Sequence, residues 1–346
     1  MKKYFPLFWV FYLLCAFSAH AGEGRYTIPL TGGGWSLWLD KEASWQNDRL
    51  YLPHEITDLS LLPVNVPTGG WQTLSHNPDA VPVEVPGTVE EYLTVTDNPR
   101  PENFRGVSWW YRKITIPADQ QKKRFIIYFE SVRMRAEVYL DGKLVAYDLI
   151  GETPFHVDIT DEAKPGKEQL LAIRVTNPGG NFHWQDFDIM KWGEYNIPPS
   201  RSFTGIIGRV KLESVNPVFI SDIYMQNTPE LTKVNAILSF TNETSSSVKQ
   251  DVELIVNEKG NPDKVVFRQT LKAISFPAGN HEVTIPVNVP DAKLWDLSTP
   301  ELYTCNVLIK KGKKTLDQDK KDFGFRWFTV DGVGKDAVLR LNGRRI

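Results

Sequence analysis

The sequence has almost no cysteine. Its 346 residues contain two, Cys15 and Cys305, and Cys15 lies in an N-terminal segment that we expect to be removed. A single remaining thiol excludes an intrachain disulfide, so the fold must be stabilised by burial of apolar surface, which a chain of this length can supply. Cys305 lies in the strand-like run Leu302–Ile309, and we predict a small buried apolar side chain there instead of a reactive thiol.

An excess of charge of either sign is also absent. The chain has 40 basic and 42 acidic residues and a net charge of −2, which gives no indication of a nucleic-acid partner. Long apolar runs are missing as well. The longest, Tyr4–Phe17, has about 14 residues against the ~20 of a membrane span. It follows Lys2 and Lys3 and precedes the A-x-A site Ala19–Ala21, so residues 1–21 are predicted to be a secretory signal peptide. We therefore expect a periplasmic or secreted protein without a membrane span; an uncleaved anchor is the alternative.

The motifs of common catalytic chemistries are missing. The six histidines are scattered, and the sequence contains no H-x-x-x-H, C-x-x-C, G-x-S-x-G or P-loop pattern. We therefore expect no metal ion and no cofactor. The Gly-rich segment Thr31–Trp35 is not followed by the helix and Lys-Ser/Thr of a phosphate loop, and we interpret it as a turn.

Aromatic and turn-forming residues are abundant. The chain has 11 Trp, 18 Phe and 12 Tyr beside 23 Pro and 24 Gly, a mixture that favours short strands packed into β-sandwiches. Up to residue 215 we predict strands at Trp110–Ile116, Arg124–Phe129, Ala136–Leu140, Lys143–Tyr147, Phe155–Ile159 and Leu170–Val175. Asp141-Gly142 between two of these runs indicates a hairpin. The spacing, without any long helical period, favours an all-β sandwich.

A second series of strand-like runs follows the boundary that we place at Asn216-Pro217. Its members are Ile220–Met225, Val234–Phe240, Val252–Val256, Val265–Phe267, His281–Ile285 and Tyr303–Ile309. Their spacing is typical of an immunoglobulin-like sandwich, without the Cys-Trp-Cys signature of antibody domains. Three features near the end complete the pattern: a hairpin tip at Lys310–Lys314, a final strand at Phe323–Phe328, and a hairpin at Val338–Ile346 whose return strand has only just begun.

The order of several segments resembles the non-catalytic N-terminal half of glycoside hydrolase family 2, the family of β-galactosidases, β-glucuronidases and β-mannosidases. The segments that carry the resemblance are Val85–Thr88, Gly106–Lys113, Phe129–Gly142, Gly205–Val210, Leu294–Tyr303, Phe323–Arg326 and Leu341–Arg344. Ser131 and Asp141 stand where the family usually has Gly and Asn. The resemblance implies a galactose-binding-like jelly roll over residues 22–215, an immunoglobulin-like sandwich over 216–325, and a linker or hairpin over 326–346.

The resemblance also implies that a (β/α)₈ barrel carrying two catalytic glutamates follows Ile346, and that this chain has no catalytic residue of its own. The barrel would be a partner in the whole enzyme. Asn242-Glu243 and Asn257-Glu258 imitate the Asn-Glu of the family's acid, but we place them at a turn and a strand end of the second sandwich, away from any barrel loop. Asn242 also begins a glycosylation sequon, which we interpret as a plain surface turn.

One long segment is a candidate for contact with carbohydrate. Residues 181–195 are rich in aromatic and acidic side chains and lie between two predicted strands. Flat rings can stack on a sugar while carboxylates bind its hydroxyls, so Trp184, Asp186, Asp188 and Trp192 are the predicted substrate-binding residues. The alternative is that these rings cover the edge of the sandwich or dock on the barrel.

Three functions remain open at this point. The first is the N-terminal part of an exported family-2-like glycoside hydrolase, inactive by itself. The second is a stand-alone carbohydrate-binding protein, and the third is an adhesion module without a ligand. If Leu339, Leu341 and Ile346 normally pack on a barrel, the isolated chain exposes apolar surface and should associate.

Overall fold

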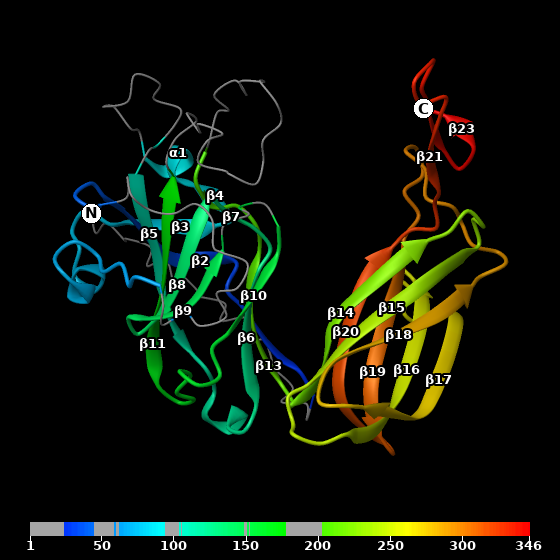
Figure 1. The fold of residues 1–346 in the computed structure, drawn as a ribbon, viewed down its shortest axis with the longest axis horizontal. Helices are drawn as coiled ribbons and strands as arrows, with labels where there is room; N and C mark the ends of the chain where they lie inside the picture. The colour runs from blue at the N-terminus through cyan, green and yellow to red at the C-terminus, as the bar shows by residue number, and fades with distance from the viewer. Residues whose placement is uncertain are drawn as a thin grey trace, which may run out of the picture.

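The structure is a computed structural model that describes residues 24–44, 59, 62–93, 104, 106–148, 151, 153–177 and 203–346. Two β-sandwiches stand side by side and are joined at one end, so that a V-shaped gap opens between them (Figure 1). A small sheet rises from the second sandwich at the open end of the V. The all-β prediction, a jelly roll followed by an immunoglobulin-like sandwich, is confirmed.

The first sandwich packs a four-stranded sheet, β1-β13-β6-β10, against a six-stranded sheet, β3-β2-β5-β11-β8-β9, and a small sheet, β4-β12-β7, lies at one end. Its strands are β1 (Tyr26–Pro29), β2 (Gly32–Asp40), β3 (Val81–Val85), β4 (Gly87–Thr88), β5 (Gly106–Thr115), β6 (Arg124–Phe129), β7 (Val132–Arg133), β8 (Arg135–Leu140), β9 (Lys143–Asp148), β10 (Phe155–Asp158), β11 (Glu168–Asn177), β12 (Gly205–Ile206) and β13 (Val210–Val215). Short helical turns are α1 (Val89–Tyr92), η2 (Trp71–Ser75) and η3 (Ala118–Gln120).

Alternation along the strands builds the core of this sandwich. In β6, Phe125, Ile127 and Phe129 point inward, and the residues between them face the other way. Trp35 and Trp110 lie in the same core with at most 1% of their surface exposed. Each such ring buries roughly 150–250 Å², and these rings pack among the Val, Ile and Leu side chains that form most of the core.

The second sandwich packs β14-β15-β18 against β17-β16-β19-β20 around a separate core. Its strands are β14 (Val218–Asn227), β15 (Lys233–Asn242), β16 (Val248–Glu258), β17 (Val265–Phe276), β18 (Gly279–Asn288), β19 (Tyr303–Lys311) and β20 (Lys314–Phe323). Cys305 is fully buried in this core, as predicted, and burial raises the pKa of its thiol to about 12. The tip at Lys310–Lys314 is confirmed, because β19 turns into β20 there through Gly312 at a φ of 62°.

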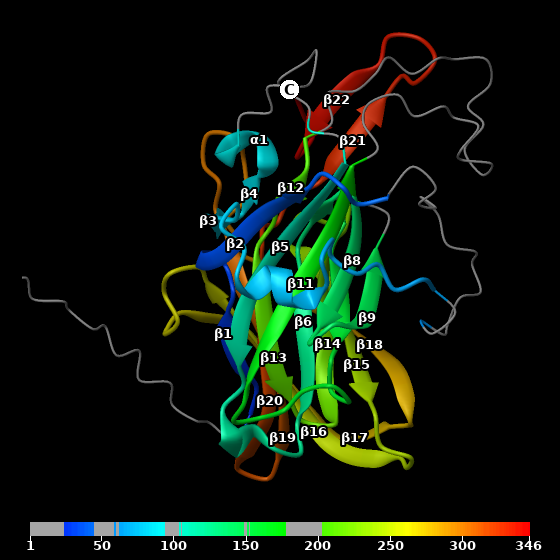
Figure 2. The same cartoon turned by 90° about the vertical axis from the view of Figure 1, so that its left-hand side faces the viewer.

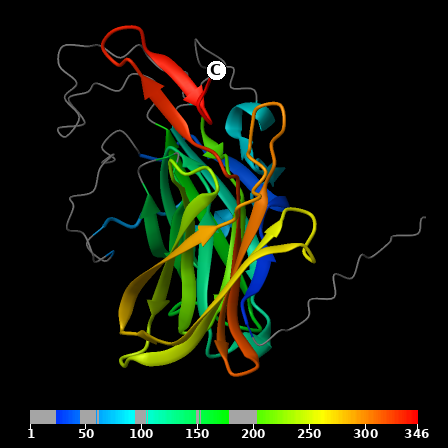
Figure 3. The ribbon, with the colours of Figure 1, turned by 90° about the vertical axis from the view of Figure 1, so that its right-hand side faces the viewer.

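The last sheet consists of β21 (Phe328–Asp331), β22 (Val338–Leu341) and β23 (Arg344–Arg345). Figure 3 shows it standing above the second sandwich. The predicted hairpin is confirmed: Leu341 pairs with Arg344 across Asn342-Gly343, two residues with positive φ.

Three expectations were wrong in detail. Thr31–Trp35 is not a turn, because β2 already begins at Gly32 and bulges before Trp35; Gly32 and Gly34 have φ of 93° and 86°, which permits the bulge within the ladder. Phe323–Phe328 is not one strand. β20 ends at Phe323, and the backbone of Phe325, a fully buried residue, forms an isolated bridge with Leu294 before β21 begins. Leu341 is not available for docking, since only 4% of its surface is exposed.

Candidate functional site

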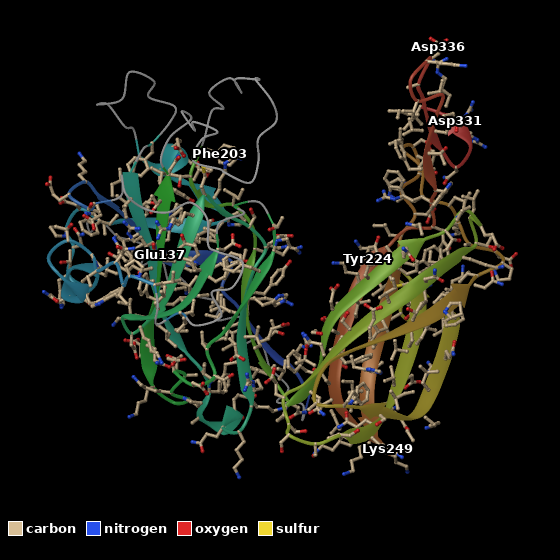
Figure 4. The ribbon with its side chains drawn as sticks, in the orientation of Figure 1. Glu137, Phe203, Tyr224, Lys249, Asp331 and Asp336 are labelled. Carbon is tan, nitrogen blue, oxygen red and sulfur yellow. The ribbon has the colours of Figure 1, made fainter. Side chains whose placement is uncertain are left out.

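The predicted sugar-contact residues Trp184, Asp186, Asp188 and Trp192 lie outside the described residues. The segments on both sides of them are described. β11 ends at Asn177, and the chain is described again from Phe203, at the same end of the jelly roll. Figure 4 shows Phe203 at this end, beside the open side of the V.

A partly buried carboxylate ties the two flanks together. Glu90, on α1, accepts hydrogen bonds from the backbone N–H of Phe104 (3.0 Å) and of Thr204 (3.2 Å). Asn177 donates from Nδ2 to the carbonyl oxygen of Phe104 at 2.8 Å. Burial raises the pKa of Glu90 above its ordinary value, against the effect of these N–H donors. The side chain therefore acts as a cross-brace between α1, the segment before β5 and the segment before β12.

An aromatic ring and a guanidinium group lie beside this brace. Arg133 stacks on Phe203 with 4.5 Å between its Cζ and the ring centroid, and 38% of the Phe203 surface is exposed. Thr204 donates from Oγ1 to the carbonyl oxygen of Arg133 at 2.9 Å. Gly205 permits the tight crossing of β4 and β12, because a Cβ there would lie 2.2 Å from the carbonyl oxygen of Gly87. We call Glu90, Phe104, Arg133, Phe203 and Thr204 the jelly-roll rim.

Sequence reasoning missed the rim residues. Phe203 lies only just beyond the long candidate segment. An aromatic residue close to Gly205 was the one signal that the sequence offered. Glu90 and Arg133 gave no signal, because their partners are far away in the sequence. A flat ring can pack against a sugar, and a guanidinium beside it can donate hydrogen bonds to the sugar oxygens.

The outer face of the six-stranded sheet is already occupied. Trp71 from η2 packs edge-on against Trp109 (5.6 Å) and lies 5.0 Å from Tyr139. Trp109 and Tyr139 are fully buried, so neither ring offers a face to a ligand. The segment that carries Thr68 and Trp71, called the covering segment, is fixed by polar contacts. Thr68 N–H and Trp109 Nε1 both donate to Oδ2 of Asp40.

A buried ionic cluster anchors the same segment. Glu137 lies between Arg135 and Arg174, accepts from the hydroxyl of Tyr139 at 2.7 Å, and accepts from Nδ2 of Asn65 at 2.9 Å. Glu137 has only 1% of its surface exposed and lies within the jelly roll in Figure 4. Because both arginines compensate its charge, the cluster serves to hold the covering segment on the sheet.

The two Asn-Glu pairs do not form a catalytic pair. Glu243 follows the end of β15, and Glu258 ends β16, so the two residues belong to different sheets of the second sandwich. Glu258 pairs with Lys264 at 2.7 Å, which holds the pKa of this carboxyl below its ordinary value. A retaining glycosidase instead needs two carboxyl groups about 5–5.5 Å apart on one site.

The sequon at Asn242 is closed in the folded chain. Asn242 has 2% of its surface exposed; its Nδ2 donates to the carbonyl oxygens of Ser246 and Phe276, each at 2.9 Å, and its Oδ1 accepts from Thr244. The side chain organises the turn between β15 and β16. Its amide nitrogen is therefore inaccessible to a glycosyltransferase once the domain has folded.

Two features are absent from the described part of the chain. There, no group of three or more His, Cys, Asp or Glu side chains is arranged to hold a metal ion. No helix among these residues has the length and apolarity needed to cross a membrane.

The base of the V forms a polar cleft of about 1240 Å³. One wall is the outer face of β1-β13-β6-β10, where Lys211, Tyr128 and His156 form a cross-strand row. The ring centroids of Tyr128 and His156 are 5.1 Å apart, and Nζ of Lys211 lies 5.3 Å from the Tyr128 centroid. The other wall comes from β14, β15, β18 and β20. Since the walls belong to different sandwiches, the cleft depends on how the two are held together.

Comparison with known proteins identifies both sandwiches. Residues 33–197 match the sugar-binding domain of the glycosyl hydrolases family 2, and residues 218–326 match the family model for glycosyl hydrolases family 2. The two matches follow one another in the order of the two sandwiches and together span most of the chain.

Similar proteins are much longer than this chain. A β-glucuronidase from Formosa agariphila is 26% identical over 70% of this chain but only 25% of its own length. A β-galactosidase from Bacteroides ovatus is 25% identical over 69% of this chain and 26% of its own length. A family 2 structure from Bacteroides cellulosilyticus has the same fold, with a TM-score of 0.64 and 19% identity over 92% of this chain and 38% of that one. The chain spans about a quarter of the curated relatives named here, and it belongs to glycoside hydrolase family 2.

Proposed function

We propose that this chain is the N-terminal, non-catalytic part of an exported glycoside hydrolase that cleaves O-glycosidic bonds in carbohydrates. The observation that carries the proposal is the ordered match of both sandwiches to family 2, together with the small share of each relative that the chain covers. The two sandwiches act as a scaffold for a catalytic barrel that supplies the two glutamates.

The exposed apolar side chains support a seat for such a barrel. Phe328, Val330 and Leu339 on the last sheet each expose about half of their surface, at 51%, 45% and 45%. Tyr224, 54% exposed, lies on β14 on the side that faces the V, and Phe203 lies at the facing end of the jelly roll (Figure 4). Exposed apolar groups around one opening are typical of an interaction surface.

The jelly-roll rim gives the scaffold a second task. We place it, with the adjoining segment that carries Trp184 and Trp192, at the edge of the substrate cleft, where rings and carboxylates contact the sugar. The carbohydrate is the partner in this proposal, and no cofactor is required, because two carboxyl groups suffice for glycoside hydrolysis.

The test uses the open reading frame that contains these 346 codons. The downstream codons are expected to encode a (β/α)₈ barrel with an Asn-Glu pair, and the full product should hydrolyse a nitrophenyl glycoside. In that enzyme Trp184→Ala should raise KM or lower kcat, and an unchanged KM and kcat would remove the sugar-contact role of the segment. A stop codon after Ile346, together with oligosaccharide affinity of the chain by calorimetry, would support a stand-alone binding protein instead.

Export is part of the same proposal. Residues 1–21 lie outside the described residues, and the support for a signal peptide is the sequence pattern of Lys2, Lys3, the apolar run and the A-x-A site. Mass spectrometry of the protein secreted by a bacterial host tests it: the expected N-terminus is Gly22, and an intact Met1 would contradict it.

A further inference from the structure

The first described residues lie between the two sandwiches. The carbonyl oxygen of Gly24 accepts a hydrogen bond from Nζ of Lys123 in the jelly roll at 3.1 Å. On its other side, a Cβ on Gly24 would lie 3.7 Å from the carbonyl oxygen of Leu316, in the second sandwich. The chain then enters β1, which pairs with β13 along the edge of the jelly roll (Figure 2). This path brings Arg25 to the junction.

The guanidinium group of Arg25 contacts both sandwiches. From the jelly roll, Glu213 accepts from Nη1 at 3.0 Å. From the second sandwich, Asp317 accepts from Nε at 3.2 Å and from Nη2 at 3.0 Å, a two-point contact with one carboxylate. Asp319 accepts from Nη1 at 3.3 Å, and the carbonyl oxygen of Ile220 accepts from Nη2.

The groups around Arg25 form a preorganised site, because most of them are buried and their acceptor atoms match the donors of a guanidinium group. The Arg25 side chain is 8% exposed, that of Glu213 is 7% exposed, and that of Asp317 is fully buried. Burial raises the pKa of Asp317, against the effect of Arg25 and of the N–H of Ile220, which donates to Asp317 at 2.7 Å. Although burial also opposes ionisation of Glu213, Arg25 and Lys211 hold the pKa of that carboxyl below its ordinary value.

The charge balance shows what the site would do without its cation. Three carboxylates from two domains surround one guanidinium. Removal of Arg25 leaves Asp317 and Asp319 on one side facing Glu213 on the other, and among the described residues only Glu213 of the three keeps a cation within the jelly roll, Lys211 at 2.8 Å. Breaking a buried pair by removing one partner is strongly destabilising because the remaining charge is uncompensated. We expect the two domains to separate in response, because separation returns the carboxylates to water without unfolding either core.

We propose that Arg25 is an interdomain latch: its guanidinium occupies a composite binding site formed by Glu213, Asp317, Asp319 and the carbonyl of Ile220, and thereby fixes the angle of the V. The planar five-donor geometry of Arg is what reaches both walls at once. A lysine ammonium supplies the charge without the two-point contact. The latch does not depend on the identity of the glycoside or on the presence of a barrel.

The experiment is chemical rescue in the 346-residue chain, without its predicted signal peptide. Arg25→Ala removes the guanidinium, and Arg209→Ala is the matched control, since Arg209 pairs with Glu130 within the jelly roll at an exposed site. Small-angle scattering reports the interdomain angle, and calorimetry reports whether the two sandwiches melt together. Guanidinium ion at low millimolar concentration is compared with sodium and with tetramethylammonium at equal ionic strength.

We expect Arg25→Ala to increase the maximum dimension of the chain and to split its melting into two transitions. Guanidinium should reverse both changes, and the two other cations should not. Arg209→Ala should match the wild type. Unchanged scattering and a single transition in folded Arg25→Ala would overturn the latch, as would equal rescue by sodium. If Arg25→Ala does not fold, Arg25→Lys, which keeps the charge, is read in the same way: an increase in maximum dimension supports the latch and wild-type scattering contradicts it.

Discussion

The carboxylate of Glu90 lies 3.0 Å from the backbone nitrogen of Phe104 through Oε1 and 3.2 Å from that of Thr204 through Oε2. One side chain on a four-residue helix thus holds the segments before two strands of the jelly roll. Without it, two backbone donors at the base of the predicted sugar segment would lose their acceptor.

We therefore predict that Glu90→Ala destabilises the chain. A buried donor without a partner costs about 1–3 kcal/mol, and the loss should appear as a lower urea midpoint with an unchanged slope. Glu91→Ala is the matched control, because the neighbouring Glu91 side chain is exposed on the same helix. Equal urea midpoints for the two variants would show that the Glu90 side chain contributes nothing to the stability of the fold.

A second prediction concerns the turn at Asn242. Asn242→Ala leaves the carbonyl oxygens of Ser246 and Phe276 without their donor, and we expect a loss of about 1–3 kcal/mol in the free energy of unfolding. Asn235→Ala, at a partly exposed position with a 3.4 Å contact, is the control and should cost less. Expression in a glycosylating host tests the closed sequon: folded protein should carry no glycan at Asn242, and a glycopeptide containing it would contradict the structure.

Cys305 should be inert in the native state. Burial raises the pKa of its thiol to about 12, so the reactive thiolate is scarce at neutral pH. For the chain without residues 1–21, and so without Cys15, mass spectrometry after treatment with iodoacetamide should find no label on the native protein and one label on the protein unfolded in urea. Rapid labelling of the native chain would mean that the second core opens locally.

The stability of the chain should depend on pH through His156. Burial lowers the pKa of His156 below 6.5 in the folded state, so the unfolded chain binds the proton more tightly. Stability is then complete above pH 6.5 and is lost as the pH falls through the folded pKa. His156→Gln should therefore weaken the dependence of the urea midpoint on pH below pH 6.5. If the urea midpoint of His156→Gln depends on pH as strongly as that of the wild type, His156 is not the group responsible.

The last sheet should make the isolated chain associate. Phe328, Val330, Leu339 and Ile346 are exposed on it, and light scattering at high protein concentration should show particles larger than a monomer. The double variant Phe328→Ser and Leu339→Ser should reduce this association without changing either sandwich. A wild-type chain that remains a clean monomer at high concentration would contradict the proposed seat.

Local signals made most strands predictable. Asp141-Gly142 between two β-rich runs predicted the hairpin of β8 and β9, and the run Arg124–Phe129, interpreted as a buried strand, predicted β6 to the residue. The errors came where glycines with positive φ allow a strand to bulge, or where an apolar run is interrupted between two strands. Gly32 and Gly34 lie in a bulged strand where the sequence alone suggests a turn. The backbone of Phe325 pairs with Leu294 in an isolated bridge that no local pattern encodes.

The site was less predictable than the fold, for a physical reason. Glu90 binds Thr204 and Arg25 binds Asp317, in each case more than one hundred residues away along the chain, and a lone charged residue carries no mark of such a partner. The predicted contacts Trp184, Asp186, Asp188 and Trp192 were chosen by composition alone and remain predictions.

The most direct test of the scaffold assignment is the hydrolysis of nitrophenyl glycosides by the purified 346-residue chain and by the complete product of its reading frame. The account predicts no turnover by the chain above the buffer rate and turnover by the complete product. Release of nitrophenol by the chain alone would contradict it, because the chain would then hold its own pair of catalytic carboxylates.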